Sequence, residues 1–367
     1  MKAAVLTAIG APLEIWDDVE VDDPQAGEVR IRMAAAGVCH SDLAMQNGTI
    51  PVPLPAVLGH EGAGFVDAAG PSVDGLEVGD LVAVSWVAQC GGCFYCRRAQ
   101  PHLCERATVA MASGGQLDGT SRLRSPRSHL FQALGAGTFA EATVVPAIAA
   151  VKLPPDIDPV VAAMLGCAVV TGVGAALNTA AIRVGDTVAV VGCGGVGLNV
   201  IQGARLAGAE RIVAVDVHAE KLALALAVGA TDAVDARDAH PVGAVMDLTA
   251  QKGADVTFEV IGRGSTIEQS LAMTRRGGQT VLVGIPAMDV MLEIPAMVGI
   301  VLAEKTIKGC WLGSSDIHRD IPRLVEWYRQ GELRLDDLVS RRIEVGGVNA
   351  AFAAMEAGAV ARSVIVF

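Results

Sequence analysis

Cysteine and histidine side chains of the kind that zinc prefers occur in three separate parts of this chain. Cys39 lies in the segment GVCHSD, His60 in LGHEGAG and Cys167 in GCAVVTG. Zinc binds thiolate and imidazole ligands, and three protein ligands leave the fourth position open, as a catalytic zinc site requires. An isolated cysteine or histidine can equally be an ordinary core residue. These residues therefore open the hypothesis of a catalytic zinc without deciding it.

A second group of cysteines has a far more specific spacing. Cys90, Cys93, Cys96 and Cys104 form the pattern CxxCxxCx7C. Four thiolates can complete a tetrahedron around zinc and exclude substrate, which is typical of a structural metal site. The chain's eight cysteines could suggest disulfides, but a large chain that is not exported is expected in a reducing compartment, where clustered cysteines more often bind metal. The spacing therefore predicts a structural zinc.

The segment from Thr187 to Asp216 carries the pattern of a dinucleotide site. An apolar, β-branched run ends at the turn GCGGVG, a helical spacing of apolar residues follows, and a second apolar run ends at Asp216. Gly192 would make the tight turn, Gly194 would let the backbone approach a pyrophosphate, and Gly197 would let the helix lie close to the strand. The phosphates would meet free N–H groups at the positive end of the helix.

Asp216 indicates which dinucleotide the segment would bind. Its carboxylate suits the 2′ and 3′ hydroxyls of an adenosine ribose, whereas a 2′-phosphate would meet a negative charge. The pattern therefore favours NAD over NADP. A glycine-rich turn alone can mean only tight packing, and the flanking strands, helix and acid are what favour the coenzyme interpretation.

Length and charge limit the class of protein. At 367 residues the chain exceeds what one core usually holds, so we expect two domains. A formal net charge of −12 argues against nucleic acid or an anionic membrane surface as a partner. The local basic cluster of Arg122, Arg124 and Arg127 is expected in a solvated loop. Because acids follow so soon after the first residue, we expect no signal peptide and a cytoplasmic protein.

One uncharged stretch, residues 160–182, is long enough to cross a bilayer. Glycine, threonine and asparagine residues interrupt it, so we expect a buried helix and no membrane association.

Periodic patterns predict the elements that would position these motifs. Near the N-terminus they predict a small antiparallel sheet from strands at 3–6, 14–21 and 28–33. Beyond Asp216 helix and strand patterns alternate, which predicts a doubly wound sheet. The expected elements there are helices at 220–228 and 265–275 and strands at 255–260 and 279–283. Two further helices are expected at 321–330 and 348–356.

The motifs together resemble one protein family. GVCHSD, LGHEGAG, CGGCFYC, DGTSR, GCAVVTG, VVGCGGVG, AVD and KGCWLG occur in the order seen in zinc-dependent alcohol dehydrogenases of the medium-chain dehydrogenase/reductase superfamily. The resemblance covers essentially the whole chain. The long segment 106–138 is most similar to the branch of dimeric classical alcohol dehydrogenases and thiol-dependent formaldehyde dehydrogenases.

This resemblance implies an α/β fold with two domains. Residues 169–311 would form an NAD-binding Rossmann domain with a doubly wound parallel sheet. Residues 1–168 and 312–367 would form a GroES-like, mainly β catalytic domain that carries the structural zinc lobe. The family also implies two zinc ions per chain, NAD(H) as coenzyme, and a homodimer that pairs through the cofactor domain. The apolar segment 290–302 with residues 308–311 resembles the edge strand of that pairing.

The resemblance also assigns roles around the catalytic zinc, whose ligands would be Cys39, His60 and Cys167. Glu61 would exchange with bound water or briefly ligate the metal. Asp42 would orient His60 through its other ring nitrogen, although it could be a simple turn or cap residue. Ser41 would contact the substrate oxygen. Ala44 stands where the best-known members have a proton-relaying histidine, so His40 or ordered water would take that role.

Residues that match the family's coenzyme site come from both expected domains. They are His40, Thr171, Gly192, Gly194, Gly195, Val196, Gly197, Asp216, Lys221, Val283 and Arg362. Within this set His40 and Arg362 match contacts to the pyrophosphate, Lys221 lies near the adenosine ribose and Val283 lies near the nicotinamide. A surface lysine or arginine would look the same in the sequence.

Substrate identity is less well defined. The positions that match the family's pocket are Ile50, Trp86, Val109 and Leu312, which favours apolar or aromatic alcohols as substrates of reversible hydride transfer. A thiol-dependent formaldehyde dehydrogenase is the alternative, but Ile50 and Thr108 stand where that branch has an acid and an arginine. A non-catalytic NAD-binding protein is a third hypothesis. Its mark would be loss of a zinc ligand or of Ser41, and none is lost.

Overall fold

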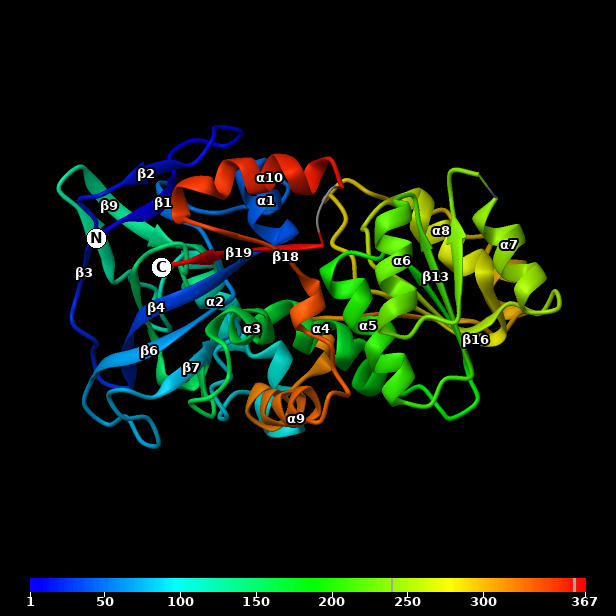
Figure 1. Ribbon diagram of the computed structural model, residues 1–367, viewed down its shortest axis with the longest axis horizontal. Coiled ribbons are helices and arrows are strands. Elements are labelled where there is room, and N and C mark those ends of the chain that lie inside the picture. Colours follow the sequence, from blue (N-terminus) through cyan, green and yellow to red (C-terminus); the bar gives the residue numbers. More distant parts are fainter. Residues whose placement is uncertain (239, 359–360) are drawn as a thin grey trace. The chain divides into compact units, whose positions relative to one another are not determined.

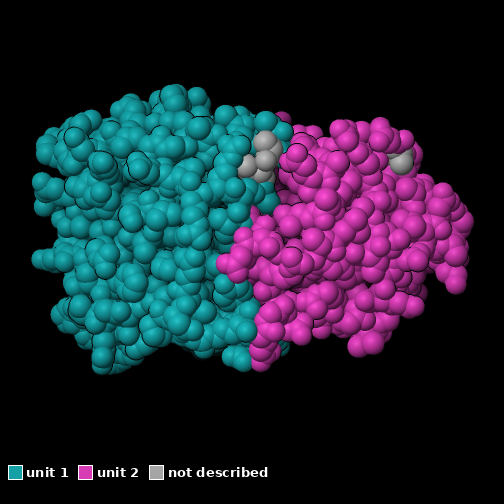
Figure 2. Space-filling model, in the orientation of Figure 1, with its two compact units in different colours: residues 1–167, 316–329, 339–367 teal, residues 168–315, 330–338 magenta. Residues whose placement is uncertain are grey.

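The computed structural model describes residues 1–238, 240–358 and 361–367, and the chain divides into two compact units (Figure 2). The first unit contains Met1–Cys167, Asp316–Arg329 and Val339–Phe367. The second contains Ala168–Ser315 and Gln330–Leu338. The domain limits expected from the sequence stay a prediction.

The second unit is built on a parallel sheet (Figure 1). Within the described residues the strand order is β14-β13-β12-β15-β16-β17, and every neighbouring pair runs parallel. The strands are β12 (Thr187–Val191), β13 (Arg211–Asp216), β14 (Asp232–Asp235), β15 (Ala254–Glu259), β16 (Thr274–Leu282) and β17 (Thr306–Gly309). This is the 3-2-1-4-5-6 order of a Rossmann sheet, whose ligand crevice lies where the strand order reverses. The expected doubly wound fold is confirmed.

Helices alternate with these strands along the chain. They are α4 (Val170–Gly174), α5 (Gly195–Leu206), α6 (Ala219–Val228), α7 (Pro241–Leu248) and α8 (Gly264–Met273). In α5 the side chains of Leu198, Ile201 and Ala204 recur at helical spacing and are fully buried, which explains why this segment packs as a helix.

The segment 290–302 is not the edge strand that the sequence suggested. A single turn of π-helix, Ala296–Val301, occupies it after Pro295, and the strand at the edge of the sheet is β17. An apolar run of this length does not distinguish a strand from a helical turn by its pattern alone.

The first unit is mainly antiparallel β-structure. One sheet has the order β2-β1-β5-β9-β8-β3, and the other has β11-β7-β6-β4-β19-β18 with β10 beside β4. The strands are β1 (Ala3–Leu6), β2 (Glu14–Trp16), β3 (Glu20–Val21), β4 (Glu28–Val38), β5 (Ala56–Val57), β6 (Gly62–Ala69), β7 (Leu81–Val84), β8 (Leu123–Ser125), β9 (Ser128–Gln132), β10 (Ala142–Pro146), β11 (Ala150–Lys152), β18 (Val339–Ile343) and β19 (Arg362–Val366). The expected single strand at 14–21 is therefore wrong. It is split into β2, which pairs with β1, and β3, which pairs with β8.

The helices of the first unit are short apart from α9. They are α1 (His40–Gln46), α2 (Glu105–Ser113), α3 (Pro159–Met164), α9 (Ile317–Arg329) and α10 (Val348–Glu356). The apolar helical stretch Pro159–Thr179 is long enough to cross a membrane, but 89% of its most apolar window is buried inside the structure. It is therefore a core helix, as the sequence predicted.

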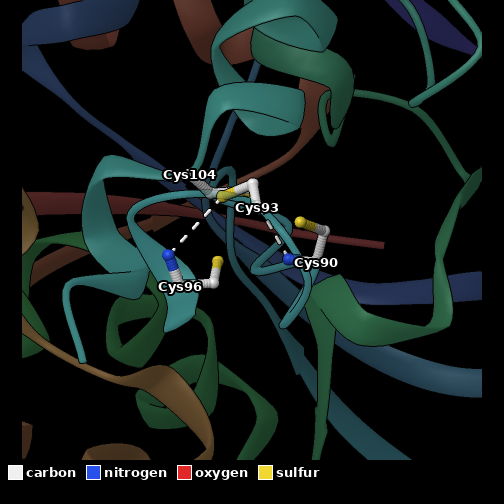
Figure 3. A group of neighbouring side chains, drawn as sticks. All are labelled: Cys90, Cys93, Cys96 and Cys104. Atoms are coloured by element: carbon white, nitrogen blue, oxygen red, sulfur yellow. Dashed lines mark hydrogen bonds between the residues drawn. The ribbon is translucent and has the colours of Figure 1, made fainter. Parts of the chain in front are cut away.

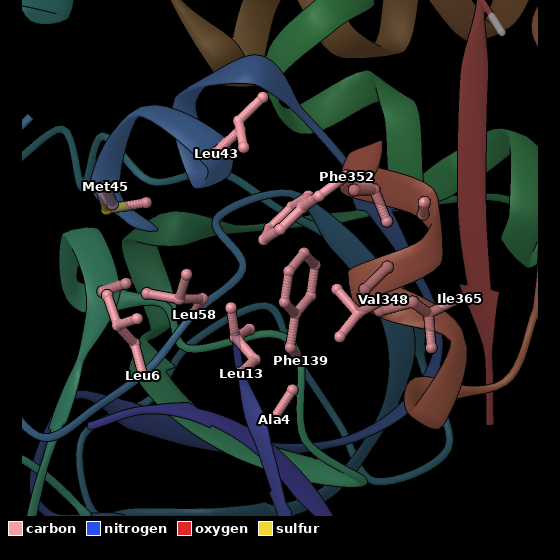
Figure 4. Packing of buried hydrophobic residues seen from close by; sticks show 14 of the residues in the cluster. Ala4, Leu6, Leu13, Leu43, Met45, Leu58, Phe139, Val348, Phe352 and Ile365 are labelled. Carbon is pink, nitrogen blue, oxygen red and sulfur yellow. The ribbon is translucent and has the colours of Figure 1, made fainter. Parts of the chain in front are cut away.

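A hydrophobic cluster in the first unit supports the segments that carry the candidate zinc ligands (Figure 4). Leu43 and Met45 enter it from α1, Leu58 enters it two residues before His60, and Phe139 and Phe352 fill its centre. Interiors of this kind are close-packed, so these side chains fix where the adjoining backbone lies.

Arg122 departs from the expected solvated loop. Its side chain is only 3% exposed, and its guanidinium donates to both carboxylate oxygens of Glu28, at 2.9 and 2.7 Å, and to Asp118 at 2.8 Å. Burial alone would lower the pKa of Arg122, but the hydrogen bonds to Glu28 and Asp118 raise it. Arg124 and Arg127 are exposed, as expected, and pair with surface acids.

The buried pair predicts a specific loss of stability. Glu28→Ala should lower the free energy of unfolding by about 3–5 kcal/mol, because Arg122 would keep a buried charge without its bidentate partner. Urea unfolding followed by tryptophan fluorescence measures the change. The control is Asp22→Ala, which removes one of the exposed acidic partners of Arg124 and should cost no more than about 1 kcal/mol. Equal losses in the two variants would contradict the role of burial.

Candidate functional site

Three elements of the first unit bring Cys39, His60 and Cys167 together. Cys39 follows β4 directly and caps α1, His60 follows β5 by three residues, and Cys167 lies in a π-helical turn, Leu165–Val169. Their ligand atoms all lie within 4.8 Å of one another. The three side chains are 5%, 1% and 7% exposed, so the cluster is shielded from bulk water. Two sulfurs and one imidazole nitrogen at this spacing form a donor set that zinc prefers.

Asp42 holds the histidine of this cluster in place. One carboxylate oxygen, Oδ1, lies 2.9 Å from Nδ1 of His60 and accepts from the N–H of Gly59 at 3.2 Å. The other, Oδ2, accepts from the N–H of Cys39 at 3.0 Å. The carboxylate is fully buried, so it favours a proton on Nδ1 and leaves Nε2 as the ligand atom. In the structure Asp42 therefore both caps the first turn of α1 and contacts the His60 ring.

Two glycines allow the ligands to approach one another. A Cβ atom at Gly37 would lie 2.4 Å from Oε1 of Glu61, and one at Gly166 would lie 1.9 Å from the carbonyl oxygen of Val84. Any side chain at Gly166 would push the turn that carries Cys167 away from β7. The sequence pattern alone did not single out these two glycines. Their position one or two residues before a candidate ligand was the available signal.

The charges of the cluster depend on one another. The hydrogen bond from Cys167, together with the charges of Arg362 and His60, holds the pKa of the Cys39 thiol well below its usual value in spite of burial. The hydrogen bond to Cys39 and burial raise the pKa of Cys167 well above its usual value. Burial alone would lower the pKa of His60, but the Asp42 carboxylate and Cys39 raise it well above the usual range.

The ionised and hydrogen-bonded groups of Cys39, His60 and Cys167 form an environment that would stabilise a cation. Nε2 of His60 is buried and has no hydrogen-bond partner among the described residues. A divalent metal would replace the protons on the thiols and imidazole, since metal ligands must be deprotonated. The donor set and the unpartnered nitrogen fit zinc, with Cys39, His60 and Cys167 as its ligands.

Glu61 and Arg362 form a buried ion pair beside this cluster. Glu61 is fully buried and Arg362 is 4% exposed, and the guanidinium donates through Nη2 to Oε1 of Glu61 and through Nη1 to the carbonyl oxygen of Val38 at 3.2 Å. Burial alone would lower the pKa of Arg362, but the charges of Glu61, Cys39 and Cys167 raise it above its usual value. Arg362 is thus no surface residue. Its contact with Glu61 joins positions 301 residues apart, and nothing in the sequence indicated it.

The remaining candidate residues of the first unit differ in burial. The Oγ atom of Ser41 lies 4.0 Å from Sγ of Cys39, and His40 is exposed at the start of α1. The ring of Trp86 meets the His60 ring edge-on at 6.3 Å between centroids. Ile50 is half-buried against the hydrophobic cluster, whereas Val109 on α2 is 59% exposed.

The second cysteine cluster gathers Cys90, Cys93, Cys96 and Cys104 in one loop (Figure 3). Their sulfur atoms lie within 4.8 Å of one another. The N–H groups of Cys90 and Cys96 point at the sulfurs of Cys104 and Cys93, at 3.4 and 3.5 Å. Backbone N–H groups directed at sulfur stabilise thiolates, as a four-thiolate zinc site requires.

The thiols of this loop do not ionise alike. Burial would raise the pKa of Cys93, but hydrogen bonds from the N–H groups of Cys96 and Glu105 lower it to about 6. Burial and the hydrogen bond to Cys93 raise the pKa of Cys96 to about 12. One thiolate suppresses ionisation of its neighbours, and only a cation at the centre would stabilise all four. The loop therefore fits a structural zinc.

The glycine loop of the second unit has the geometry of a phosphate cradle. Gly192 has φ +98°, and a Cβ atom at Gly197 would lie 1.9 Å from the carbonyl oxygen of Gly192, so the turn and the close helix both require glycine. At Gly194 an added Cβ would meet nothing within 4 Å, which leaves open space for a ligand. Gly195 and Val196 begin α5, whose first N–H groups have no side-chain cap. This arrangement fits a pyrophosphate.

Asp216 ends β13 beside this loop. Its Oδ2 atom accepts from the N–H of Cys193, inside the glycine loop, at 2.7 Å, so the carboxylate and the loop are fixed together. Lys221 is half-buried on α6, Val283 follows β16, and Thr171 is buried in α4. Leu312, a candidate pocket residue, belongs to the second unit and is 2% exposed.

Known protein families match both units. The alcohol dehydrogenase GroES-like domain matches residues 25–155, and the zinc-binding dehydrogenase family matches residues 195–330. These matches confirm the GroES-like domain and the dehydrogenase class that the sequence motifs indicated.

Relatives that match over nearly their whole length are also named as dehydrogenases. The chain is 37% identical over 367 residues to an S-(hydroxymethyl)glutathione dehydrogenase of Synechocystis sp., covering 99% of each chain. It is 38% identical to an alcohol dehydrogenase class-3 of Drosophila melanogaster, covering 99% of this chain and 97% of the relative. The crystal structure of benzyl alcohol dehydrogenase from Acinetobacter calcoaceticus superposes with a TM-score of 0.94 at 31% identity, covering 100% of this chain and 99% of that one. The chain therefore belongs to the zinc-dependent alcohol dehydrogenases of the medium-chain dehydrogenase/reductase superfamily.

Proposed function

We propose that this dehydrogenase oxidises primary or secondary alcohols with apolar or aromatic substituents, reversibly and with NAD as the coenzyme. The observation that carries the proposal is the convergence of Cys39, His60 and Cys167 on one point with Trp86 beside His60. A donor set with three protein ligands leaves room for a substrate oxygen. The indole ring next to it favours an apolar substituent on the carbon that reacts.

Each residue around this point has its own task. When bound, zinc supplies Lewis acidity that acidifies a hydroxyl group, and NAD supplies the hydride acceptor. Asp42 keeps the proton of His60 on Nδ1, so that Nε2 stays a ligand atom. Ser41 Oγ lies 4.0 Å from Sγ of Cys39, beside the proposed metal ligands, and we propose it as the first group to accept the substrate's proton. His40, which is exposed, or ordered water would pass that proton to solvent, because Ala44 cannot.

Arg362 and Glu61 are proposed to adjust the charge beside the metal. Their buried pair brings a guanidinium to within Coulombic reach of the Cys39 and Cys167 thiols. An anion that attracted Arg362 would weaken its hold on Glu61, and the freed carboxylate would lie close to the metal ligands. This coupling connects the two roles that the family resemblance implies for these residues.

A thiol-dependent formaldehyde dehydrogenase is the second candidate. It is favoured by the 37% identical relative, which is named an S-(hydroxymethyl)glutathione dehydrogenase. The residues at the expected glutathione contacts argue against it. Ile50 is apolar and half-buried, and the hydroxyl of Thr108 donates to the carbonyl oxygen of Cys104 in its own helix, at 3.1 Å. Neither side chain offers a charge to a glutathione carboxylate or ammonium group.

We further propose a cytoplasmic homodimer that pairs through the second unit. β17 is the last strand at one edge of its sheet, and all four of its residues are exposed. Exposed apolar side chains lie before it in the chain, namely Met288, Met291, Met297, Val298, Val301 and Leu302. A free strand edge flanked by such side chains favours pairing with a second copy.

Substrate preference is tested by a panel of ethanol, 2-propanol, benzyl alcohol and S-hydroxymethylglutathione, each with NAD and with NADP. Benzyl alcohol should exceed ethanol in kcat/KM by about tenfold or more, because an apolar pocket rewards added apolar surface. A glutathione adduct that is the best substrate would instead establish the second candidate. If the parent does not oxidise the glutathione adduct, the double variant Ile50→Asp, Thr108→Arg should oxidise it faster than the parent does, because it supplies the two missing charges.

Zinc content distinguishes the two metal sites. The purified chain should contain about two zinc ions after dialysis. Cys39→Ser should retain about one and lose at least about 100-fold in kcat, because the catalytic donor set is broken. Cys93→Ser should also retain about one but should chiefly lose thermal stability. Cys310→Ser, outside both clusters, serves as the control and should keep both ions. Full zinc in Cys39→Ser would contradict the proposed ligand set.

The dimer is tested at the strand edge. Ile307→Lys combined with Val301→Lys should halve the mass measured by light scattering during gel filtration, since buried lysines would oppose pairing. Val184→Lys is the matched control, because Val184 is 86% exposed in the same unit but lies away from β17 in the sequence. A dimer that persists in the double variant would place the contact elsewhere.

A further inference from the structure

A compact group of charged and titratable side chains lies where β13 and β14 end. Asp216 and Asp235 are the last residues of these neighbouring strands and are partners in the parallel register. His218 follows Asp216 by two residues and caps α6. Ligands of doubly wound sheets bind at the carboxyl ends of the strands, so this group lies at the ligand-binding edge.

His218 occupies part of the hydrogen-bonding capacity of Asp216. The Oδ1 atom of Asp216 accepts from the N–H of His218 at 3.0 Å and lies 3.2 Å from its Nδ1 atom. Oδ2 is engaged with the N–H of Cys193. A carboxylate offers about four lone-pair sites, so three are used when Nδ1 carries a proton. The imidazole therefore limits what Asp216 can still offer to a ribose diol.

The proton on Nδ1 determines what the other ring nitrogen can do. A lone pair on Nδ1 would face the carboxylate oxygen at 3.2 Å, so Nδ1 is the protonated nitrogen. Nε2 is then an acceptor in the neutral ring and a donor in the imidazolium. Because the side chain is 36% exposed, whereas Asp216 is 8% exposed, a ligand at Asp216 can reach the ring. A neutral ring suits a ribose hydroxyl, and an imidazolium suits a phosphate.

We propose that His218 is a specificity-determining residue for the coenzyme: its neutral ring favours the ribose diol of NAD, and its imidazolium offsets Asp216 and admits the 2′-phosphate of NADP. This inference rests on the proposed use of a nicotinamide coenzyme at the glycine loop. The preference for NAD over NADP then depends on the charge of the His218 ring as well as on the Asp216 carboxylate.

The other charged groups around His218 largely offset one another, so they do not cancel the effect of its protonation on Asp216. Asp235 faces it from β14, and the hydrogen bond from Arg237 lowers the pKa of Asp235 to about 2, with a smaller contribution from His218. Arg237 pairs with Asp235 at 2.7 Å, so these two charges offset each other. Glu220 and Lys221 lie on α6, which His218 caps, and carry opposite charges. Protonation of His218 therefore changes the charge balance at Asp216 by one full charge.

Equilibrium binding to the full-length protein tests the proposal without turnover. Isothermal titration calorimetry would give the dissociation constants of NAD⁺ and NADP⁺ at pH 5.8 and pH 8.0. In the parent, the ratio Kd(NADP⁺)/Kd(NAD⁺) should fall about fivefold more on acidification than in His218→Asn, because an exposed charge pair contributes up to about this factor. The 2′-phosphate also titrates near pH 6, but it does so equally in both proteins and cancels in the comparison.

A permanent cation provides the second arm of the test. His218→Lys should bind NADP⁺ about fivefold more tightly than the parent at pH 8.0, with little gain at pH 5.8. His129→Asn, at an exposed histidine on β9 of the first unit, is the control and should match the parent throughout. Circular dichroism would verify that each variant is folded.

Two results separate the possible failures. An identical pH response in the parent and His218→Asn, with no gain in His218→Lys, would overturn the role of His218 and leave the proposed function intact. Failure of the parent to bind either coenzyme at either pH would overturn the proposed function and this inference with it.

Discussion

Three buried donor atoms, from Cys39, His60 and Cys167, are held within 4.8 Å of one another, and the first unit is organised to keep them there. Ionised thiols at this spacing repel each other, and burial disfavours each charge further. The folded chain resists this repulsion with fixed partners. Asp42 accepts from both the Cys39 backbone and the His60 ring, so one carboxylate joins two of the three ligand segments.

Packing supplies the rest of the constraint. Leu43 follows Asp42 directly, Leu58 lies two residues before His60, and both enter the same hydrophobic cluster, so the ligand segments move only if that cluster is disturbed. Gly166 lets the third segment approach β7 more closely than any side chain would allow. The hydrophobic cluster and the two glycines, Gly37 and Gly166, thus set the geometry of the donor atoms together with the local hydrogen bonds. The glycine loop of the second unit follows the same rule, since Gly197 permits a close backbone contact.

Local chemistry explains which features could be predicted from the sequence. The glycine turn, the cysteine spacing and the alternating strands and helices beyond Asp216 depend on neighbours in the chain, and the structure contains each of them. Long-range partners were missed. Arg122 reads as part of a basic loop until Glu28, 94 residues away, is placed beside it, and the buried contact of Arg362 with Glu61 spans 301 residues. Pattern alone does not reveal which distant residue will neutralise a charge.

The structural cysteine lobe also positions a helix that carries a residue predicted to line the substrate pocket. Cys104 caps α2, and that helix carries Thr108, whose hydroxyl donates to the carbonyl oxygen of Cys104. A metal held by Cys104 and its three partners would therefore fix where α2 begins and how its next turn is oriented. Val109, a predicted pocket residue on that turn, is 59% exposed. The lobe that excludes substrate from its own metal thus fixes the helix that carries Val109, and the role of Val109 in the substrate pocket stays a prediction.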